Sequence, residues 1–385
     1  MIQKKPLCGI IPPLVTPLKD NETLDIESLE RLIEHLIAGG VHGLFILGTT
    51  GEEQSLSYDV RKQMIREACR INHGRLPLLA CITDTSIVES IRLAKVAADC
   101  GADGVVSAPP YYFATGQPEL AQFYEELVPQ LPLPVFLYNM PSHVKVSFAP
   151  DTVRRIAQNP QVIGFKDSSA NAVYFQSVMY KMQERKDFAM LVGPEEITGE
   201  CVLLGAHGGI NGGANMFPEL NVAMYAAARA GDITKVRQLQ QYIMQISTSI
   251  YTVGKHGSSY LKGLKCALSL LGIINDDFVA SPFYKFDAPE RDRIRQALAA
   301  LPIENGKLCI QEISSFSWSL PLALWCLAVA SLEKGVQLMS LPQQAVPYQD
   351  GLWACRFLPP MFRASAISAI PARPSLPIGM LLSSH

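Results

Sequence analysis

Short apolar runs alternate with amphipathic stretches from residue 9 to about residue 215. The segment DIESLERLIEHLIAGGVHGLFILGTTGE (25–52) shows the repeating unit. Asp25 can cap a helix whose apolar residues recur at helical spacing, and Gly39 and Gly40 can end that helix. The run Leu44–Leu47 follows with apolar residues on both faces, which predicts a strand buried on both sides.

This unit of helix and buried strand recurs along the chain. We predict eight strands, over residues 9–17, 44–47, 78–82, 101–110, 134–139, 162–167, 188–193 and 205–212. Helical stretches separate nearly every pair, so the pattern predicts an α/β fold with a parallel sheet, and eight units predict a closed (β/α)8 or TIM barrel. A doubly wound open sheet is the alternative. It more often carries a glycine fingerprint after its first strand, where this chain has PPLVTP.

Beyond residue 215 the pattern is wholly helical. The predicted helices are Glu219–Arg229, Ile233–Tyr251, Ser259–Leu271 and Pro289–Leu301. We therefore expect residues 1–218 to form the barrel core and residues 219–302 to form a C-terminal helical extension of the same domain.

Residues 303–385 have a different character. They hold all three tryptophans and eight prolines, and they carry few charges. This composition predicts an atypical, poorly ordered tail. The uncharged run 313–332 is long enough to span a bilayer, but its serines and Pro321 favour the tail interpretation over a membrane span.

Composition and charge exclude several classes of protein. The net charge is −2 and no long basic run is present, so nucleic acid is not an expected partner. The nine cysteines show no spacing suited to zinc, which favours reduced thiols and predicts no metal site. The apolar N-terminal stretch is broken by Pro12, Pro13 and Pro17, which makes a poor signal peptide, and we expect a cytoplasmic location.

Chemistry is expected at the carboxyl ends of the barrel strands, because the loops that follow the strands converge there. VIGFKDSSA (162–170) reads as a buried strand that delivers Lys166 near its end. Desolvation in a partly apolar pocket lowers the pKa of a lysine, and the resulting amine can attack a carbonyl and form a Schiff base. The alternative is a surface lysine paired with Asp167.

Tyr138 ends the preceding predicted strand, 28 residues earlier in the chain. Schiff-base formation and carbon–carbon cleavage both move protons, which a phenol can carry, and the hydroxyls of Thr49 and Thr50 could hold that phenol in place. A core tyrosine and an ordinary Gly-Thr-Thr-Gly turn are the alternatives for these two features.

Five motifs in this order resemble the dihydrodipicolinate synthase/N-acetylneuraminate lyase superfamily of pyruvate-dependent class I aldolases. They are GTTGE (48–52), APPYY (108–112), YNMP (138–141), GFKDSS (164–169) and VGPEE (192–196), and the resemblance covers about residues 6–302. It implies a homotetramer, a dimer of dimers, of (β/α)8 barrels. The implied reaction condenses pyruvate or another 2-oxo acid with an aldehyde, or reverses that condensation, without a metal or organic cofactor.

The resemblance also implies roles for single residues. Lys166 would form the Schiff base, Tyr138 would shuttle protons, and Thr50 would be its relay partner. The partner subunit's Tyr112 would complete the relay. Thr49 and Thr50, with their backbone amides, would hold the pyruvyl carboxylate.

The second substrate is less constrained by the sequence. Synthases of this superfamily usually carry an arginine for the semialdehyde carboxylate at the place where this chain has His143, which cannot supply a guanidinium fork. After Gly193, the pair Glu195 and Glu196 resembles the acidic pair with which sialic acid lyases hold substrate hydroxyls. Acidic residues also suit the first turn of a helix, which is the alternative for this pair.

Ile210 is a further candidate substrate contact, within GGINGGAN (208–215), a run that suits an anion nest or a tight turn. Together these features favour a sugar-acid aldolase, of the N-acetylneuraminate lyase or 2-keto-3-deoxy acid type. The alternative within the same chemistry is 4-hydroxy-tetrahydrodipicolinate synthase. A non-catalytic 2-oxo-acid-binding protein is the alternative from another class, although such a protein needs no nucleophilic amine.

Overall fold

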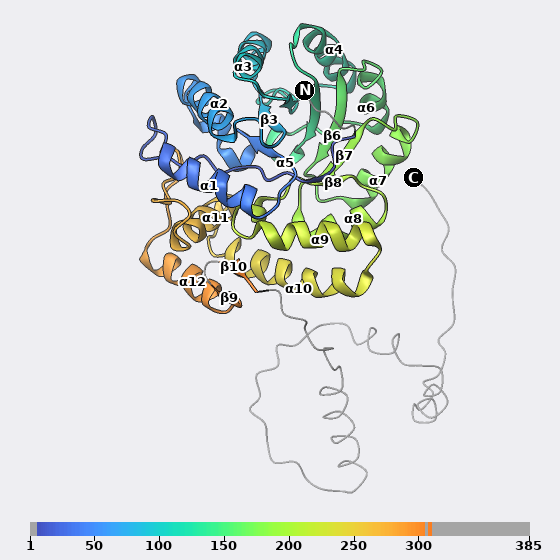
Figure 1. The fold of residues 1–385 in the computed structure, drawn as a ribbon. Helices are drawn as coiled ribbons and strands as arrows, with labels where there is room; N and C mark the ends of the chain where they lie inside the picture. Colours follow the sequence, from blue (N-terminus) through green and yellow to red (C-terminus); the bar gives the residue numbers. More distant parts are fainter. Residues whose placement is uncertain (1–5, 305–306, 310–385) are drawn as a thin grey trace, which may run out of the picture. The chain divides into compact units, whose positions relative to one another are not determined.

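Eight parallel strands form a curled sheet in the computed structural model, which describes residues 6–304 and 307–309 (Figure 1). The strands are β1 (Gly9–Ile10), β2 (Leu44–Ile46), β3 (Leu78–Cys81), β4 (Gly104–Ser107), β5 (Val135–Asn139), β6 (Val162–Asp167), β7 (Ala189–Val192) and β8 (Gly208–Gly209). Each lies inside one of the eight predicted ranges, so the predicted strands are confirmed.

The sheet closes on itself between β1 and β2. Strands β2 to β8 follow one another in chain order, and β1 pairs in parallel with β8. Just beyond β1, Leu14 N donates to Phe45 O at 2.8 Å and Phe45 N donates to Pro12 O at 3.0 Å, which joins β2 to the first strand segment. Pro12 and Pro13 have no N–H and cannot donate a hydrogen bond to β2. The pairing therefore uses the N–H groups of Leu14 and Phe45. The predicted closed barrel is confirmed.

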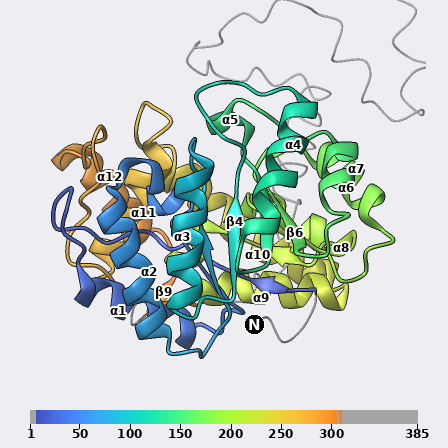
Figure 2. The same ribbon diagram turned by 90° about the horizontal axis from the view of Figure 1, so that it is seen from above.

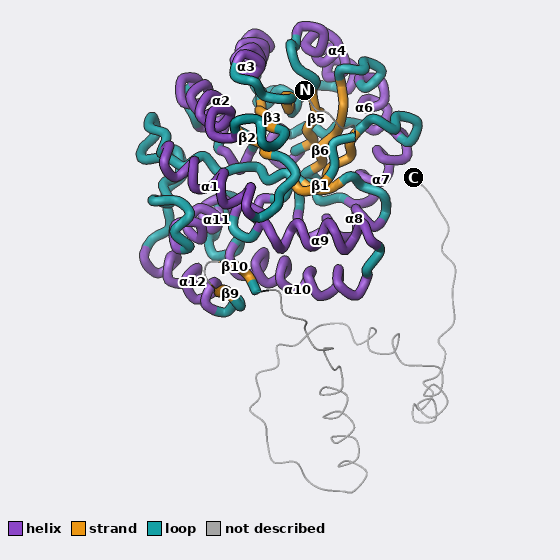
Figure 3. The backbone as a smooth tube through the Cα atoms, in the orientation of Figure 1, coloured by secondary structure: helices purple, strands orange, loops and turns teal. Residues whose placement is uncertain are grey.

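Helices surround the barrel strands, as Figures 2 and 3 show. They are α1 (Ile26–Ala38), α2 (Tyr58–Asn72), α3 (Ile87–Asp99), α4 (Gln117–Leu127), α5 (Pro141–Val144), α6 (Pro150–Ile156), α7 (Ala172–Met182) and α8 (Thr198–Leu203). The first begins at the predicted cap, since the Asp25 carboxylate accepts a hydrogen bond from Ser28 N at 3.2 Å. It ends before Gly40, whose φ of +78° is a conformation that glycine adopts without steric cost.

The helical extension follows the barrel in chain order and packs beside it (Figure 1). Its helices are α9 (Pro218–Ala230), α10 (Ile233–Ile250), α11 (Ser259–Leu270) and α12 (Ala288–Ala299), each within two residues of its predicted bounds. A short hairpin of β9 (Ile303–Glu304) and β10 (Lys307–Leu308) follows, and Leu308 is buried against the core. This hairpin lies just beyond the predicted boundary at 302.

The register between β5 and β6 places Tyr138 and Lys166 inside the barrel. In the β5–β6 register Phe136 lies opposite Gly164, and a side chain at Gly164 would collide with the Phe136 ring. The large ring thus fills the space beside the glycine. Side chains alternate along a strand, so two residues further on the same face continues with Tyr138 opposite Lys166.

The predicted tail, apart from residues 303–304 and 307–309, lies outside the described residues. The apolar run 313–332 lies there too. Within the part of the chain that the structure describes, no helix is both long enough and apolar enough to cross a membrane.

Candidate active site

Lys166 lies near the end of β6 with its side chain inside the barrel, where 3 % of the residue is exposed. Its Nζ lies 3.9 Å from the ring centroid of Tyr138 and 4.8 Å from that of Phe45. Asp167 does not pair with it, because consecutive strand residues face opposite sides. The Asp167 carboxylate instead accepts hydrogen bonds from Asn139 Nδ2 and Ser169 Oγ, each at 2.8 Å.

This environment lowers the pKa of Lys166 to about 7, because burial removes the water that stabilises the ammonium form. Two aromatic faces attract a cation, but no carboxylate forms an ion pair with Lys166 among the described residues. An amine near neutrality is what attack on a ketone carbon requires, because only the free amine has a lone pair to donate.

The pKa of Lys166 predicts how Schiff-base formation depends on pH. We expect the rate of adduct formation with pyruvate to rise as the pH increases through about 7 and then to level off, because the amine fraction follows this titration. The check is to quench the reaction with borohydride at successive pH values and to measure the pyruvyl adduct by mass spectrometry. A rate that rises only near the ordinary lysine pKa of about 10.4 would contradict it.

Tyr138 supplies a hydroxyl beside the amine. Its Oη lies 3.1 Å from Thr49 Oγ1. Burial raises the pKa of Tyr138 to about 12, so the phenol keeps its proton at neutral pH and can donate it. The loop after β2 therefore holds the phenol next to Lys166.

The threonine that contacts Tyr138 is Thr49, whereas the resemblance implied Thr50. Residues Thr49–Gly51 form a 3₁₀ turn, in which consecutive side chains point about 120° apart. Thr50 consequently turns away from Tyr138, and its Oγ1 lies 3.3 Å from the hydroxyl of Tyr260. The structure therefore brings Thr49, rather than Thr50, within hydrogen-bond distance of Tyr138.

A buried ion pair anchors the same loop to the helical extension. Glu52, at a left-handed φ of +60°, accepts a hydrogen bond from Lys265 Nζ, and both side chains are buried. The second carboxylate oxygen accepts from Ala280 N at 2.8 Å. The position of the Thr49–Thr50 turn thus depends on α11 and on the segment after it.

Tyr112 lies on the surface of its own chain. It is 75 % exposed, and its φ of +83° is strained for a non-glycine residue. Its ring meets that of Phe113 edge to face, with centroids 5.2 Å apart. Its ring therefore packs on Phe113 and is otherwise largely open to solvent.

Both predicted carboxylates after β7 have protein partners. Glu195 accepts hydrogen bonds from Tyr251 Oη and from Gly213 N, each at 2.6 Å. Glu196 Oε1 accepts from Ser247 Oγ at 2.5 Å. These contacts occupy acceptors that the sugar-acid interpretation assigns to substrate hydroxyls.

The remaining predicted residues lie on the same rim. Gly193 O accepts from Asn211 Nδ2 at 3.0 Å, and a side chain at Gly193 would collide with Ser168. Ile210 is buried in the core, next to the end of β8. His143 is exposed on the short helix α5, and its Nδ1 lies 3.0 Å from Ser142 Oγ.

Two residues that contact this region lie outside the sequence motifs. Tyr251 directly follows α10 and Tyr260 lies in the first turn of α11, so both come from the helical extension. Their hydroxyls reach Glu195 and Thr50 respectively. A tyrosine near a helix end gives no sequence signal for such a contact, because only the packing of the extension on the barrel produces it.

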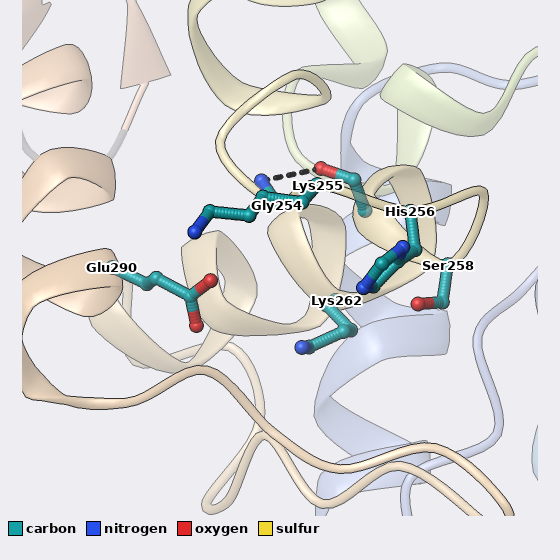
Figure 4. Close-up of a pocket in the computed structure, with 7 residues that line it drawn as sticks. Gly254, Lys255, His256, Ser258, Lys262 and Glu290 are labelled. Carbon is teal, nitrogen blue, oxygen red and sulfur yellow. Dashed lines mark hydrogen bonds between the residues drawn. The ribbon is translucent and has the colours of Figure 1, made fainter.

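A separate cavity of about 140 Å³ lies at the start of α11, as Figure 4 shows. Lys255, His256, Lys262 and Glu290 line it, and Gly254 N donates to Ser259 Oγ at 2.7 Å. None of the predicted site residues lines this cavity. Among residues 6–304 and 307–309, no group of three or more His, Cys, Asp or Glu side chains is arranged to hold a metal ion.

A model of the dihydrodipicolinate synthetase family matches residues 6–301. The chain belongs to this family. A solved structure described as dihydrodipicolinate synthase from Bacteroides thetaiotaomicron is 70 % identical, with a TM-score of 0.76, and the match covers 78 % of this chain and 100 % of that one.

Two relatives from Escherichia coli K12 add to the family assignment. The structure of YagE, a family member solved in complex with pyruvate, is 30 % identical with a TM-score of 0.73 and covers 79 % of this chain and 100 % of its own. YjhH, named as a probable 2-dehydro-3-deoxy-D-pentonate aldolase, is 30 % identical over 77 % of this chain and 98 % of its own.

These matches establish the class of chemistry, which is that of the pyruvate-dependent class I lyases and synthases of this family. They favour the synthase alternative over the sugar-acid aldolase that the sequence pattern favours. The structure at 70 % identity is described as a synthase, whereas the aldolase likeness is at 30 %.

Proposed function

We propose that the protein condenses pyruvate with aspartate semialdehyde through a Schiff base on Lys166, which is the reaction of 4-hydroxy-tetrahydrodipicolinate synthase. The observation that carries the Schiff-base part is the buried amine of Lys166, whose pKa of about 7 leaves it reactive at neutral pH. The likeness at 70 % identity to a described synthase supports the choice of aldehyde.

The chemistry assigns a task to each side chain around the amine. Lys166 Nζ attacks the ketone carbon of pyruvate, and the carbinolamine loses water to give the iminium ion. Loss of a C3 proton then gives an enamine, whose carbon attacks the aldehyde and restores an iminium ion on Lys166. The amine of the semialdehyde then attacks the iminium carbon and displaces Lys166, which closes the ring of the product and restores the free lysine. Tyr138, hydrogen-bonded to Thr49, moves the protons that these steps release and take up.

The proposed assembly is the homotetramer expected from the sequence. The partner subunit's Tyr112 reaches the Tyr138–Thr49 pair in this proposal, and the exposure and strained φ of Tyr112 support a role outside its own chain. Val173 and Tyr180, exposed on α7, line a cavity of about 490 Å³ that suits contact with another copy of the chain. The cytoplasmic location stays a prediction.

A sugar-acid aldolase is the second candidate, because His143 stands where an arginine would bind the semialdehyde carboxylate. A histidine is mostly neutral near pH 7 and offers no bidentate fork. The relative YjhH, which is named as a probable 2-dehydro-3-deoxy-D-pentonate aldolase, also supports this candidate. Against this candidate, Glu195 already accepts two hydrogen bonds from the protein, so it has less capacity for substrate hydroxyls.

A non-catalytic binding protein is the least supported reading. Among the residues that the structure describes, the buried Lys166 amine has no carboxylate partner, which costs stability, and simple binding of a 2-oxo acid gives no reason for that cost.

The two aldehyde assignments predict opposite preferences. We expect kcat/KM to be at least about 100-fold higher for pyruvate with aspartate semialdehyde than for cleavage of 2-dehydro-3-deoxy-D-pentonate, measured as pyruvate consumed or released. The reverse preference would make the protein a sugar-acid aldolase. His143→Arg is the matched variant, and it should raise kcat/KM for the semialdehyde only, because a guanidinium binds its carboxylate.

A further inference from the structure

Two tyrosine hydroxyls flank the Thr49–Thr50 pair. Tyr138 comes from β5 and contacts Thr49 at 3.1 Å. Tyr260 comes from the start of α11 and contacts Thr50 at 3.3 Å. The helical extension therefore reaches a part of the site that the sequence motifs assign to the barrel alone.

Tyr260 is supported from its far side. Its ring meets that of Tyr251 edge to face, with centroids 4.8 Å apart and planes at 73°. Tyr251 Oη donates to Glu195 Oε1, and Gly213 N donates to Glu195 Oε2. Glu195 is only 5 % exposed, so little water is present to take the place of a hydrogen bond that is lost. Each of its hydrogen bonds is therefore stronger than it would be at the surface.

The same contacts fix the turn after β8. Residues Gly212–Asn215 form a 3₁₀ turn. A side chain at Gly212 would collide with the Tyr260 hydroxyl, and one at Gly213 would collide with the Glu195 carboxylate. Glycine at both positions lets the backbone approach the tyrosine and the carboxylate closely. The contacts thus join the loops after β2, β7 and β8.

We infer that Tyr260, Tyr251 and Glu195 form a positioning network that fixes the Thr50 hydroxyl for the carboxylate of the 2-oxo acid. The inference rests on the proposed function and deepens it. A carboxylate only accepts hydrogen bonds, so its site needs donors that are already oriented. An oriented hydroxyl lowers the entropy lost on binding, and the network therefore acts on affinity for the 2-oxo acid rather than on the chemistry at Lys166.

This role for Glu195 differs from the binding of substrate hydroxyls. In the network, Glu195 holds Tyr251 and the turn after β8, and its loss weakens binding of the 2-oxo acid. As a ligand for a sugar chain, its loss would instead weaken binding of the aldehyde. A variant of Glu195 distinguishes the two roles. A higher KM for the 2-oxo acid indicates the network, and a higher KM for the aldehyde indicates a substrate ligand.

The test is Tyr260→Phe in the full chain, which removes one hydroxyl and keeps the ring. We expect the KM for pyruvate to rise about five- to tenfold, the effect of losing one hydrogen bond, while kcat changes less than about twofold. Glu195→Gln should change the same KM in the same direction, because an amide has one acceptor for two donors. Tyr284→Phe is the matched control, since Tyr284 is 79 % exposed on the extension.

An unchanged KM for pyruvate in both variants would overturn the network. A fall in kcat with no change in KM would overturn it as well, by making Tyr260 a proton carrier. If a variant folds poorly, Tyr251→Phe removes only the donor to Glu195 Oε1 and gives the same readout. The proposed function fails separately, if the wild-type protein forms no borohydride-trapped pyruvyl adduct.

Discussion

Replacing Lys166 with alanine is expected to lower kcat by about 10⁴-fold or more, because the covalent intermediate cannot form. Lys166→Arg should be equally inactive, since a guanidinium stays protonated at every accessible pH. Pyruvate consumption with the aldehyde measures both. Lys186→Ala, at an exposed lysine, is the matched control and should retain full activity. Residual turnover within tenfold of wild type would contradict the role of Lys166.

Loss of activity should not come from loss of folding. The pKa of Lys166 lies at about 7 in the folded protein and at about 10.4 in an unfolded chain, so the unfolded chain holds the proton more tightly. Burial of the charged Lys166 amine therefore costs folding free energy in full below about pH 7. This cost decreases as the pH rises from about 7 to about 10.4, and it is absent above that pH. We therefore expect Lys166→Met to have a higher free energy of unfolding than the wild-type protein at pH 7, by on the order of a few kcal/mol. This difference should vanish above about pH 10.4.

Replacing Lys265 with methionine is expected to lower the free energy of unfolding by about 3–5 kcal/mol. The change leaves the carboxylate of Glu52 buried without its cationic partner. Because Glu52 directly follows the Thr49–Gly51 turn, activity should fall even under conditions where the variant is folded. Urea unfolding followed by circular dichroism measures the stability.

Two further variants separate burial from charge. Lys285→Met breaks an exposed pair with Asp276 at 3.3 Å and should cost less than about 1 kcal/mol. The double variant Glu52→Gln, Lys265→Met removes the buried charge as well and should recover part of the stability lost in Lys265→Met. Equal costs for Lys265→Met and Lys285→Met would contradict the account of the buried pair.

The barrel is predictable from the sequence because its strands are buried on both faces. Such strands read as continuous apolar runs, and the amphipathic stretches between them mark the helices. Lys166 stands out for the same reason, because an ionisable residue in an apolar run needs an explanation. The short strand β1 is the weakest case, since Pro12 and Pro13 follow it and lack the N–H groups that would extend its pairing.

The details of the site depend on geometry that no local pattern carries. Whether Thr49 or Thr50 faces Tyr138 is decided by the rotation of a single 3₁₀ turn. Tyr260 lies 210 residues from Thr50 in the chain and meets it only because α11 packs on the barrel. The partners of Glu195 come from α10 and the turn after β8, so its occupied oxygens were not predictable from VGPEE.

The Schiff base itself is tested most directly by trapping it. The full chain is incubated with pyruvate, reduced with borohydride, and analysed by intact and peptide mass spectrometry. The account predicts a pyruvyl adduct on the peptide that contains Lys166, present in the wild-type protein and absent in Lys166→Ala. No adduct at saturating pyruvate, from protein shown to be folded, would contradict the Schiff-base mechanism.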